Sequence, residues 1–291
     1  MKEIVVISGK GGTGKTSITA SFAYLGQDEL IVADCDVDAA DMHLLLKPDF
    51  AHKDNFYSSE IAIIDQQKCI KCGNCKKICR FNAIGFDEKF KVNPMECEGC
   101  GYCANICPTE AIKMEIQNDG ELFISTTKTG SCMVHASLNI AAENSGKLVA
   151  KVKSTAKLMA EKQSKEYILV DGSPGIGCPV VSSLSGADFV VLVAEPTVAG
   201  IHDLKRVYEL VNNFDIKSGC IINKADLNPD KTVEIKHFLQ NNHIKHIAEL
   251  PYDENFTKAL TKGQTIVEYD KEELSEIVKS SWHKIKEQVN K

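Results

Sequence analysis

The segment GKGGTGKT, residues 9–16, has the spacing of a phosphate-binding loop, G-x-x-x-x-G-K-[ST]. A short β-branched run, EIVVISG (3–9), leads into it, and a segment of helical length, about 15–25, follows it. The glycines let backbone N–H groups point at phosphate oxygens, and the positive end of the helix adds to the attraction. This strand, loop and helix together predict a nucleoside triphosphate site.

Four more short apolar runs extend the pattern, with helix-length segments such as GIHDLKRVYELVNNF between some of them. Strands alternating with helices predict a mostly parallel sheet that is covered by helices on both faces. The expected fold class is therefore α/β, of the P-loop NTPase type. The further predicted strands are ELIVADCD (29–36), YILVDGSPG (167–175), FVVLVAEPT (189–197) and SGCIINKAD (218–226).

A duplicated cysteine pattern interrupts this alternation between residues 60 and 116. The spacing C-x₂-C-x₂-C-x₃-C occurs twice, offset by 28 residues, at Cys69, Cys72, Cys75, Cys79 and at Cys97, Cys100, Cys103, Cys107. A duplication this regular indicates a separate module. We expect an α/β domain of residues 1–59 and 117–291, with residues 60–116 inserted as a small α+β domain.

The duplicated spacing is that of bacterial ferredoxins with two [4Fe–4S] clusters, in which the fourth cysteine of each run binds the other cluster. Two zinc ions are the alternative, although zinc ribbons show paired C-x₂-C knuckles separated by longer loops. Pro108 follows Cys107 as in ferredoxins, whereas Arg80 follows Cys79, which alters the packing there or places a charge beside a cluster. The expected ligands are Cys69, Cys72, Cys75 and Cys107 for cluster 1, and Cys97, Cys100, Cys103 and Cys79 for cluster 2.

The composition favours a soluble, cytoplasmic protein. Hydrophobic residues make up 43% of the 291 residues, and no apolar run approaches the ~20 residues that span a bilayer. The N-terminus lacks the pattern of a signal peptide, and in the reducing cytosol twelve cysteines indicate metal rather than disulfides. The net charge of −6 lacks the basic excess of nucleic-acid-binding proteins. We expect neither a nucleic-acid partner nor membrane binding.

Lys10 makes the loop resemble one particular family. The pattern K-G-G-x-G-K-[ST] resembles the deviant Walker A motif of the MinD/ParA superfamily of ATPases (the SIMIBI class), which includes the nitrogenase iron protein and the Nbp35/Mrp iron–sulfur carriers. Over the whole chain the similarity is to superfamily members with an inserted ferredoxin domain. The resemblance implies ATP and Mg²⁺ as ligands, and an ATP-sandwich homodimer in which Lys10 reaches the partner's nucleotide. A heterodimer with a related ATPase is the alternative.

The same resemblance assigns roles to charged residues at the strand ends. In DCDVDAAD (34–41), Asp36 is expected to position the attacking water, with Asp38 and Asp41 as alternatives. Lys10, Lys15 and Asp36 form the expected catalytic set, while Thr16, Asp36 and Asp171 are expected at Mg²⁺. The expected nucleotide-binding residues are Gly9, Gly11, Gly12, Thr13, Gly14, Lys15, Thr16, Ser17, Asn223, Asp226 and Pro251.

The sequence leaves open whether the bound nucleotide is ATP, with adenine as its base, or GTP, with guanine. INKAD (222–226) ends a strand where family members place an asparagine on adenine, yet N-K-x-D is also a guanine-reading signature. ELPYDENF (249–256) resembles the family segment beside adenine, so ATP is the expected substrate.

Several residues lie outside these motifs. Cys178 follows Asp171 at the spacing of a bridging-cluster ligand in the nitrogenase iron protein, so it is either an interface cysteine or a small buried thiol. We interpret Cys35, Cys132 and Cys220 as structural thiols, and His43, His135 and His202 as surface or satisfied core residues. The C-terminal stripe that contains Trp282 is expected to dock on the core rather than on a membrane.

Three functions remain open from the sequence. The first is an ATPase that couples its nucleotide state to electron transfer from two [4Fe–4S] clusters to a redox or metallocofactor-binding partner. The second is an iron–sulfur or metallocofactor carrier, which full four-cysteine ligation disfavours. The third is a redox-sensing positioning switch of the MinD/ParA type.

Overall fold

The computed structural model describes residues 1–139, 142 and 144–291, which form two compact units. Unit 1 holds the phosphate-loop sequence, and unit 2 holds all eight cysteines of the duplicated pattern. Unit 1 comprises Met1–Asp54, Leu122–Ser137 and Ser145–Lys291, and unit 2 comprises Asn55–Glu121 and Leu138–Asn144.

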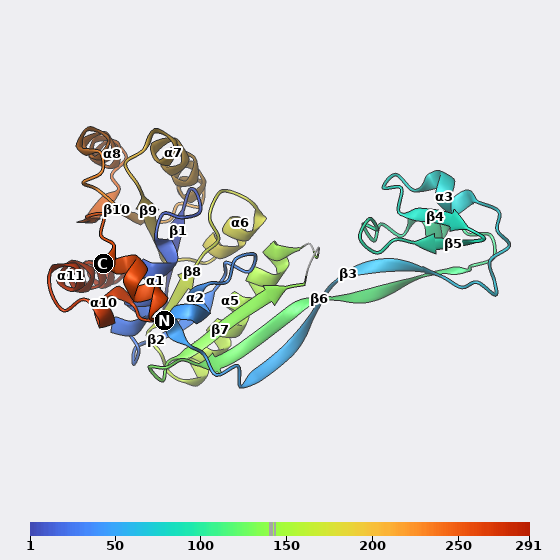
Figure 1. Ribbon diagram of the computed structural model, residues 1–291, viewed down its shortest axis with the longest axis horizontal. Coiled ribbons are helices and arrows are strands. Elements are labelled where there is room, and N and C mark those ends of the chain that lie inside the picture. Colours follow the sequence, from blue (N-terminus) through green and yellow to red (C-terminus); the bar gives the residue numbers. More distant parts are fainter. Residues whose placement is uncertain (140–141, 143) are drawn as a thin grey trace. The chain divides into compact units, whose positions relative to one another are not determined.

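A mostly parallel sheet organises unit 1 (Figure 1). Among the described residues the sheet has nine strands in the order β11-β10-β9-β1-β8-β2-β7-β6-β3, and its last two strands, β6 and β3, also run through unit 2. The strand β1 lies between β8 and β9 and is parallel to both. The strands are β1 (Lys2–Ser8), β2 (Leu30–Asp34), β3 (His52–Ile64), β6 (Ile112–Thr126), β7 (Cys132–Leu138), β8 (Tyr167–Asp171), β9 (Phe189–Ala194), β10 (Ser218–Asn223) and β11 (Lys245–Leu250).

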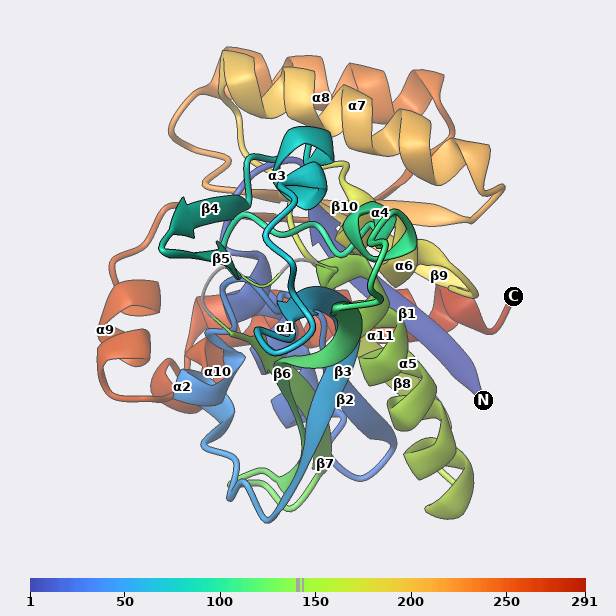
Figure 2. The same ribbon diagram turned by 90° about the vertical axis from the view of Figure 1, so that its right-hand side faces the viewer.

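Helices cover both faces of this sheet, as the alternation of strands and helices predicts (Figure 1 and Figure 2). The helices α1, α10 and α11 pack together on one face, while α5 packs on α6 and α7 packs on α8 on the other. The helices of unit 1 are α1 (Lys15–Leu25), α2 (Met42–Leu46), α5 (Ser145–Lys162), α6 (Cys178–Leu184), α7 (Val198–Asn213), α8 (Pro229–Asn241), α9 (Asn255–Thr261), α10 (Ile266–Tyr269) and α11 (Glu273–Val289).

The core of unit 1 follows from the continuous apolar run of β1. Residues Ile4 to Ile7 are fully buried, and their side chains alternate between the two faces of the sheet. On one face Ile4 and Val6 belong to a cluster that includes Phe22 of α1 and Trp282 of α11. The rings of Phe22 and Trp282 stack at 5.4 Å, which ties the last helix to the first.

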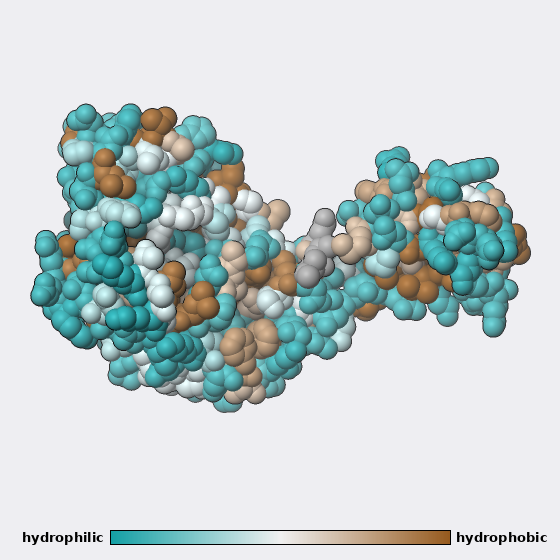
Figure 3. Space-filling view, viewed as in Figure 1, coloured by the Kyte–Doolittle hydropathy of each residue, from teal (hydrophilic) through white to brown (hydrophobic). Residues whose placement is uncertain are grey.

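The C-terminal helix α11 docks its apolar stripe on this core. Five of its hydrophobic side chains are buried there, and hydrophilic side chains cover most of the surface visible in Figure 3. No helix in the described part of the chain is long and apolar enough to cross a membrane. The buried hydrophobic residues of α11 are Leu274, Val278, Trp282, Ile285 and Val289.

Unit 2 contains two short helices, α3 (Asn74–Ile78) and α4 (Tyr102–Asn105), and a hairpin of β4 (Ile84–Asp87) and β5 (Lys89–Val92). Its cluster of buried hydrophobic residues is small, consisting of Ala62, Ile84, Phe90, Cys103 and Ile112, and other cysteines of the duplicated pattern pack against it. The duplication is also visible in the backbone. Gly73 and Gly101, which precede α3 and α4, have φ angles of 79° and 71°.

The long strands β3 and β6 are joined by a carboxylate inside unit 2. The Asp119 side chain is 5% exposed and accepts hydrogen bonds from the backbone N–H groups of Ser58 and Ser59 at 2.9 and 2.6 Å. Both serine hydroxyls also donate to it. Four donors on one carboxylate compensate for its burial and hold the two strands in one register.

His135 makes the stability of unit 1 sensitive to acid. Its ring stacks on Phe123 and hydrogen-bonds the Ser125 hydroxyl at 2.9 Å, and burial lowers its pKa from 6.5 to about 4. The unfolded chain therefore binds a proton more readily than the folded one between these pH values, so stability falls as pH falls. Lowering the pH from 7.5 to 5 should cost about 2 kcal/mol through this group.

We expect His135→Gln to remove that part of the acid sensitivity, because glutamine can still bond Ser125 but does not titrate. Urea unfolding of the variant and of the exposed control His202→Gln at both pH values measures the difference. If the wild type, His135→Gln and His202→Gln all lost the same free energy of unfolding between pH 7.5 and pH 5, His135 would not be the source of the acid sensitivity.

Candidate functional site

The carboxyl ends of four parallel strands meet at one edge of the sheet and build the site in unit 1. The phosphate loop follows β1, Asp34 ends β2, Asp171 ends β8 and Asn223 ends β10. In an open α/β sheet ligands bind at this edge, where loops can extend without disturbing the strands. A cavity of about 350 Å³ lies here, within the ~300–1,000 Å³ range of small-molecule pockets.

The cavity brings together most of the residues that the sequence predicts for nucleotide binding. Gly9 instead packs against Asp203 of α7, at a distance that leaves no room for a Cβ atom. Asp36 and Asp41 contribute from the segment after β2, while Leu45, Pro174 and Leu260 add apolar walls that the sequence did not indicate. The predicted residues that line the cavity are Lys10, Gly11, Gly12, Thr13, Gly14, Lys15, Thr16, Ser17 and Asp36.

Lys15 and Asp171 form a buried ion pair beneath the cavity. The Lys15 Nζ lies 2.9 Å from Asp171 Oδ2 and 3.4 Å from Asp36 Oδ2. The hydroxyls of Thr16 and Thr19 donate to the Asp171 carboxylate at 2.7 and 2.9 Å. Burial by itself lowers the pKa of Lys15, but the charges of Asp171 and Asp36 outweigh it and raise the pKa, so the lysine stays charged.

Asp34 is a site residue that the sequence analysis did not single out. It is 1% exposed, its Oδ1 accepts from the Asp36 N–H at 3.2 Å, and its Oδ2 has no hydrogen-bond partner among the described residues. Burial and the nearby Asp171 charge raise its pKa well above the usual value. A buried, unpartnered carboxylate oxygen beside Asp171 suits a bound cation. The sequence feature that could have identified Asp34 is its place as the first aspartate of DCD (34–36), at the end of a buried strand.

Asn223, expected at the base, instead supports the phosphate loop. Its Nδ2 donates to the Thr13 carbonyl at 2.8 Å, and a Cβ on Gly14 would come within 2.5 Å of this nitrogen. Gly14 also has a φ of 87°, which favours glycine. Asp226 accepts from the Tyr252 N–H at 2.6 Å and so orders the segment that begins with Pro251. Neither Asp226 nor Pro251 lines the cavity as it stands.

Lys10 pairs within its own chain. Its ammonium forms an ion pair with Glu195 at the end of β9, and Lys224 binds the same carboxylate at 3.1 Å. Lys224 also donates to the Gly12 carbonyl. Burial by itself raises the pKa of Glu195, but the hydrogen bonds from Lys10 and Lys224 outweigh it and hold the pKa below the usual value. The sequence analysis did not identify Glu195 or Lys224.

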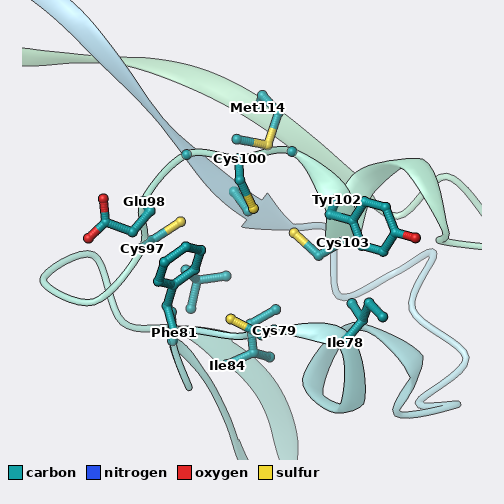
Figure 4. Close-up of a pocket in the computed structure, with 15 residues that line it drawn as sticks. Ile78, Cys79, Phe81, Ile84, Cys97, Glu98, Cys100, Tyr102, Cys103 and Met114 are labelled. Carbon is teal, nitrogen blue, oxygen red and sulfur yellow. The ribbon is translucent and has the colours of Figure 1, made fainter.

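Two hollows in unit 2 are each lined by four cysteines of the duplicated pattern. In each hollow three cysteines come from one run and the fourth from the other run. These sets are the same as those that the spacing predicts, and Figure 4 shows the four sulfur atoms of the second set around a common space. The first hollow has Cys69, Cys72, Cys75 and Cys107, and the second has Cys79, Cys97, Cys100 and Cys103.

The thiols line the walls of these hollows rather than meeting at a point. Within residues 1–139, 142 and 144–291, no three His, Cys, Asp or Glu side chains converge closely enough to hold a single metal ion. The Cys107 sulfur accepts a hydrogen bond from the Ala111 N–H at 3.3 Å, an interaction that favours a thiolate. The role of the eight cysteines as cluster ligands stays a prediction.

The remaining cysteines differ in exposure. Cys35, Cys132 and Cys220 are buried, whereas Cys178 is exposed in the first turn of α6. Gly146, near the start of α5, lies against it, since an added Cβ would be 3.2 Å from the Cys178 Cβ. The interface role of Cys178 also stays a prediction.

Comparison with known proteins identifies the family of this nucleotide site. Residues 4–266 match the model of the CobQ/CobB/MinD/ParA nucleotide-binding domain. The chain belongs to this family. An uncharacterized protein of Methanocaldococcus jannaschii, MJ0578, is 33% identical over 98% of this chain and 96% of its own length. A second protein of that organism, MJ0579, is 25% identical over 93% of each chain.

Solved structures of MinD share the fold. The MinC:MinD cell division protein complex of Aquifex aeolicus matches with a TM-score of 0.60 at 18% identity, covering 98% of this chain and 96% of that one. MinD of Pyrococcus horikoshii, complexed with Mg-ADP, matches with a TM-score of 0.57 at 16% identity, covering 98% and 95%. The prediction of an α/β P-loop NTPase fold of the MinD/ParA type is therefore confirmed.

Within this MinD/ParA-type site we expect Asp34→Asn to weaken MgATP binding about tenfold, because it removes one carboxylate charge next to Asp171. Asparagine keeps the size and still accepts from the Asp36 N–H, and it replaces an ionisable group, whose pKa burial raises, by a neutral one. The free energy of unfolding without nucleotide should therefore stay equal or rise.

Calorimetric titration with MgATP and urea unfolding measure the two quantities. Asp28→Asn, on the exposed turn before β2, is the matched control and should change neither. Unchanged MgATP affinity in Asp34→Asn would remove Asp34 from the site.

Proposed function

We propose that this chain is an ATPase of the MinD/ParA type that couples its nucleotide state to electron transfer from two [4Fe–4S] clusters to a partner protein. One observation carries the proposal. A phosphate loop with an adjacent set of buried carboxylates occurs in the same chain as two hollows, each lined by four cysteines.

The residues of the hollows fit such clusters. A [4Fe–4S] cluster takes one thiolate on each of its four irons, so its cysteines surround a volume instead of converging on one atom. A zinc site needs the converging arrangement. When bound, a cluster of this type takes up and releases one electron. The protein's part is to hold the thiolates, to exclude water and to set the surrounding charge.

In the nucleotide site the buried pair of Lys15 and Asp171 would exchange partners. The Lys15 ammonium would bind phosphate oxygens, while Asp171 and the Thr16 hydroxyl, which contact each other, would hold Mg²⁺. Each charge then keeps an opposite charge beside it, so nucleotide binding does not leave a buried ion alone. Asp36 lines the cavity, with its Oδ2 3.4 Å from the Lys15 Nζ, and there it would orient a water molecule.

ATP is the proposed substrate rather than GTP. One oxygen of Asp226 is already used by the Tyr252 N–H, which orders the segment after β11. Asn223 is committed to the phosphate loop. Asp226 therefore orders the backbone after β11 and Asn223 orders the phosphate loop, which suits adenine recognition by main-chain groups. GTP remains the alternative substrate.

Lys10 would act in an ATP-sandwich dimer only after leaving Glu195. In the single chain Glu195 holds both Lys10 and Lys224, so the lysine that would serve the partner's nucleotide is retained. Its release depends on a competing anion, which the phosphates of the partner's nucleotide supply. This would make dimerisation depend on nucleotide.

Chain connectivity supports coupling between the two units. After Asp36 and α2, the strand β3 carries the chain from unit 1 into unit 2. The chain returns through Asn144 directly into α5, which packs on α6, the helix that follows the Asp171 loop. Both segments that would respond to the γ-phosphate are therefore continuous with, or packed against, the connections to unit 2.

A second candidate is a redox-sensing switch, which the similarity to MinD favours. In that case the nucleotide state would control binding of a partner, and the clusters would sense rather than deliver electrons. A cluster carrier is disfavoured, because four cysteines from one chain line each hollow.

Iron content tests the cluster assignment. The anaerobically reconstituted protein should hold about eight iron atoms per chain, and Cys72→Ala/Cys107→Ala should hold about four, because both cysteines line the first hollow. Cys72→Ala/Cys79→Ala removes one cysteine from each hollow and should lose more. The buried-thiol control Cys220→Ala should keep about eight. Equal iron in the two double variants would contradict the crosswise sets.

Electron paramagnetic resonance of the reduced protein tests the coupling. We expect MgATP, and not MgADP, to shift the spectrum or midpoint potential, and Lys15→Ala to abolish the shift because it removes the phosphate-binding charge. The opposite outcome is that the spectra stay the same with and without nucleotide, although the protein still binds two clusters and dimerises with ATP. That result would favour the redox-sensing switch.

A further inference from the structure

The two runs of the duplicated cysteine pattern carry opposite charge. Residues 68–80 contain five cations and no carboxylate, whereas residues 96–110 contain Glu96, Glu98 and Glu110 and no cation. At the positions offset by 28, the first run's cations correspond to acidic or uncharged residues. We call the five cations the basic face: Lys68, Lys71, Lys76, Lys77 and Arg80.

The charges of the basic face are available to a partner. All five side chains are exposed. None takes part in an ion pair with a carboxylate of the described residues. The nearest carboxylates in the sequence are Asp65, which is half-buried and three residues before Lys68, and Asp87, which is exposed and seven residues after Arg80. The cations outnumber them, so the face keeps an excess of positive charge.

Lys71 stands where the backbone favours glycine. Its φ angle is 54°, in the left-handed region, and the equivalent position in the second run is Gly99, with a φ of 64°. A lysine holds this conformation at a cost in free energy that glycine would not have. The first run thus carries an exposed charge at a position where its own duplicate has glycine.

The cations of the basic face alternate along the sequence with cysteines that line the first hollow. Cys72, which lines that hollow, is exposed, and it lies next to Lys71. Ile70 lines the same hollow and is 63% exposed, whereas Phe81, which follows Arg80, lines the second hollow and is 44% exposed. Exposed apolar side chains among cations resemble a protein interface more than a phosphate-binding surface, which is dominated by charge.

We propose that the basic face binds the acidic surface of a one-electron carrier protein and positions it at the first hollow. This inference rests on the proposed function, because it assumes a cluster held by Cys69, Cys72, Cys75 and Cys107. One electron passes per encounter between that cluster and the oxidised or reduced centre of the carrier. Opposite charges steer the two proteins together and orient the carrier toward the exposed Cys72.

The test uses the full chain, loaded with clusters and reduced under anaerobic conditions. The probes are an acidic b-type cytochrome and a basic c-type cytochrome of similar size, whose haem reduction is followed by absorbance. Lys71→Glu/Lys76→Glu is compared with Lys89→Glu/Lys91→Glu. The control makes the same change in charge within unit 2, on strand residues that flank buried Phe90, whose side chain lines the first hollow.

We expect Lys71→Glu/Lys76→Glu to slow reduction of the acidic cytochrome about tenfold at low salt and to speed reduction of the basic one. The control should stay within about twofold of the wild type for both probes, and salt should reduce the wild-type rate with the acidic probe. Affinity of the fully oxidised pair, measured on immobilised acidic cytochrome, should fall in the same variant without any electron transfer.

Equal effects of the two double variants, or rates that do not depend on the sign of the probe's charge, would overturn the inference. So would a DNA duplex or an anionic vesicle that binds at physiological salt through Lys71 and Lys76 while the cytochrome rates stay unchanged. A chain that binds no iron would instead refute the proposed function, so the two failures can be told apart.

Discussion

The ion pair between Lys15 and Asp171 is the interaction on which the nucleotide site depends. It joins the phosphate loop after β1 to the end of the neighbouring strand β8, and two threonine hydroxyls complete the hydrogen bonds of the carboxylate. Two buried charges need each other in this environment, since either alone would carry a large desolvation cost. The ligand that can separate them must bring both a cation and an anion, and MgATP does so.

The buried charges around this pair are unbalanced. Asp34, Asp36 and Asp171 surround the single Lys15 ammonium, and Asp34 keeps an oxygen without a hydrogen-bond partner among the described residues. An excess of buried carboxylates lowers stability in the absence of a cation and raises the affinity for one. On the other side of the loop the opposite arrangement holds, because the single Glu195 carboxylate restrains Lys10 and Lys224.

Unit 2 meets a different constraint, which is its small core. Five buried residues with cysteines packed around them offer little apolar burial to offset the chain entropy of about 70 residues. Metal binding commonly supplies the missing stability in modules of this size. The proposed clusters would therefore stabilise the fold of unit 2 as well as carry electrons. The hydrogen bonds that Asp119 accepts from Ser58 and Ser59 also hold the long strands β3 and β6 together.

The sequence by itself determined the α/β fold, the phosphate loop and the duplicated cysteine pattern, because each depends on local spacing: glycines after a strand, apolar runs of strand length, and a repeat of 28 residues. Only the tertiary structure decided which carboxylates meet Lys15, that Asn223 supports the loop, and that Glu195 holds Lys10. These contacts join residues from β1, β2, β8, β9 and β10, which become neighbours through the strand order of the sheet. No local spacing encodes that order, because it is set by the packing of helices on both faces.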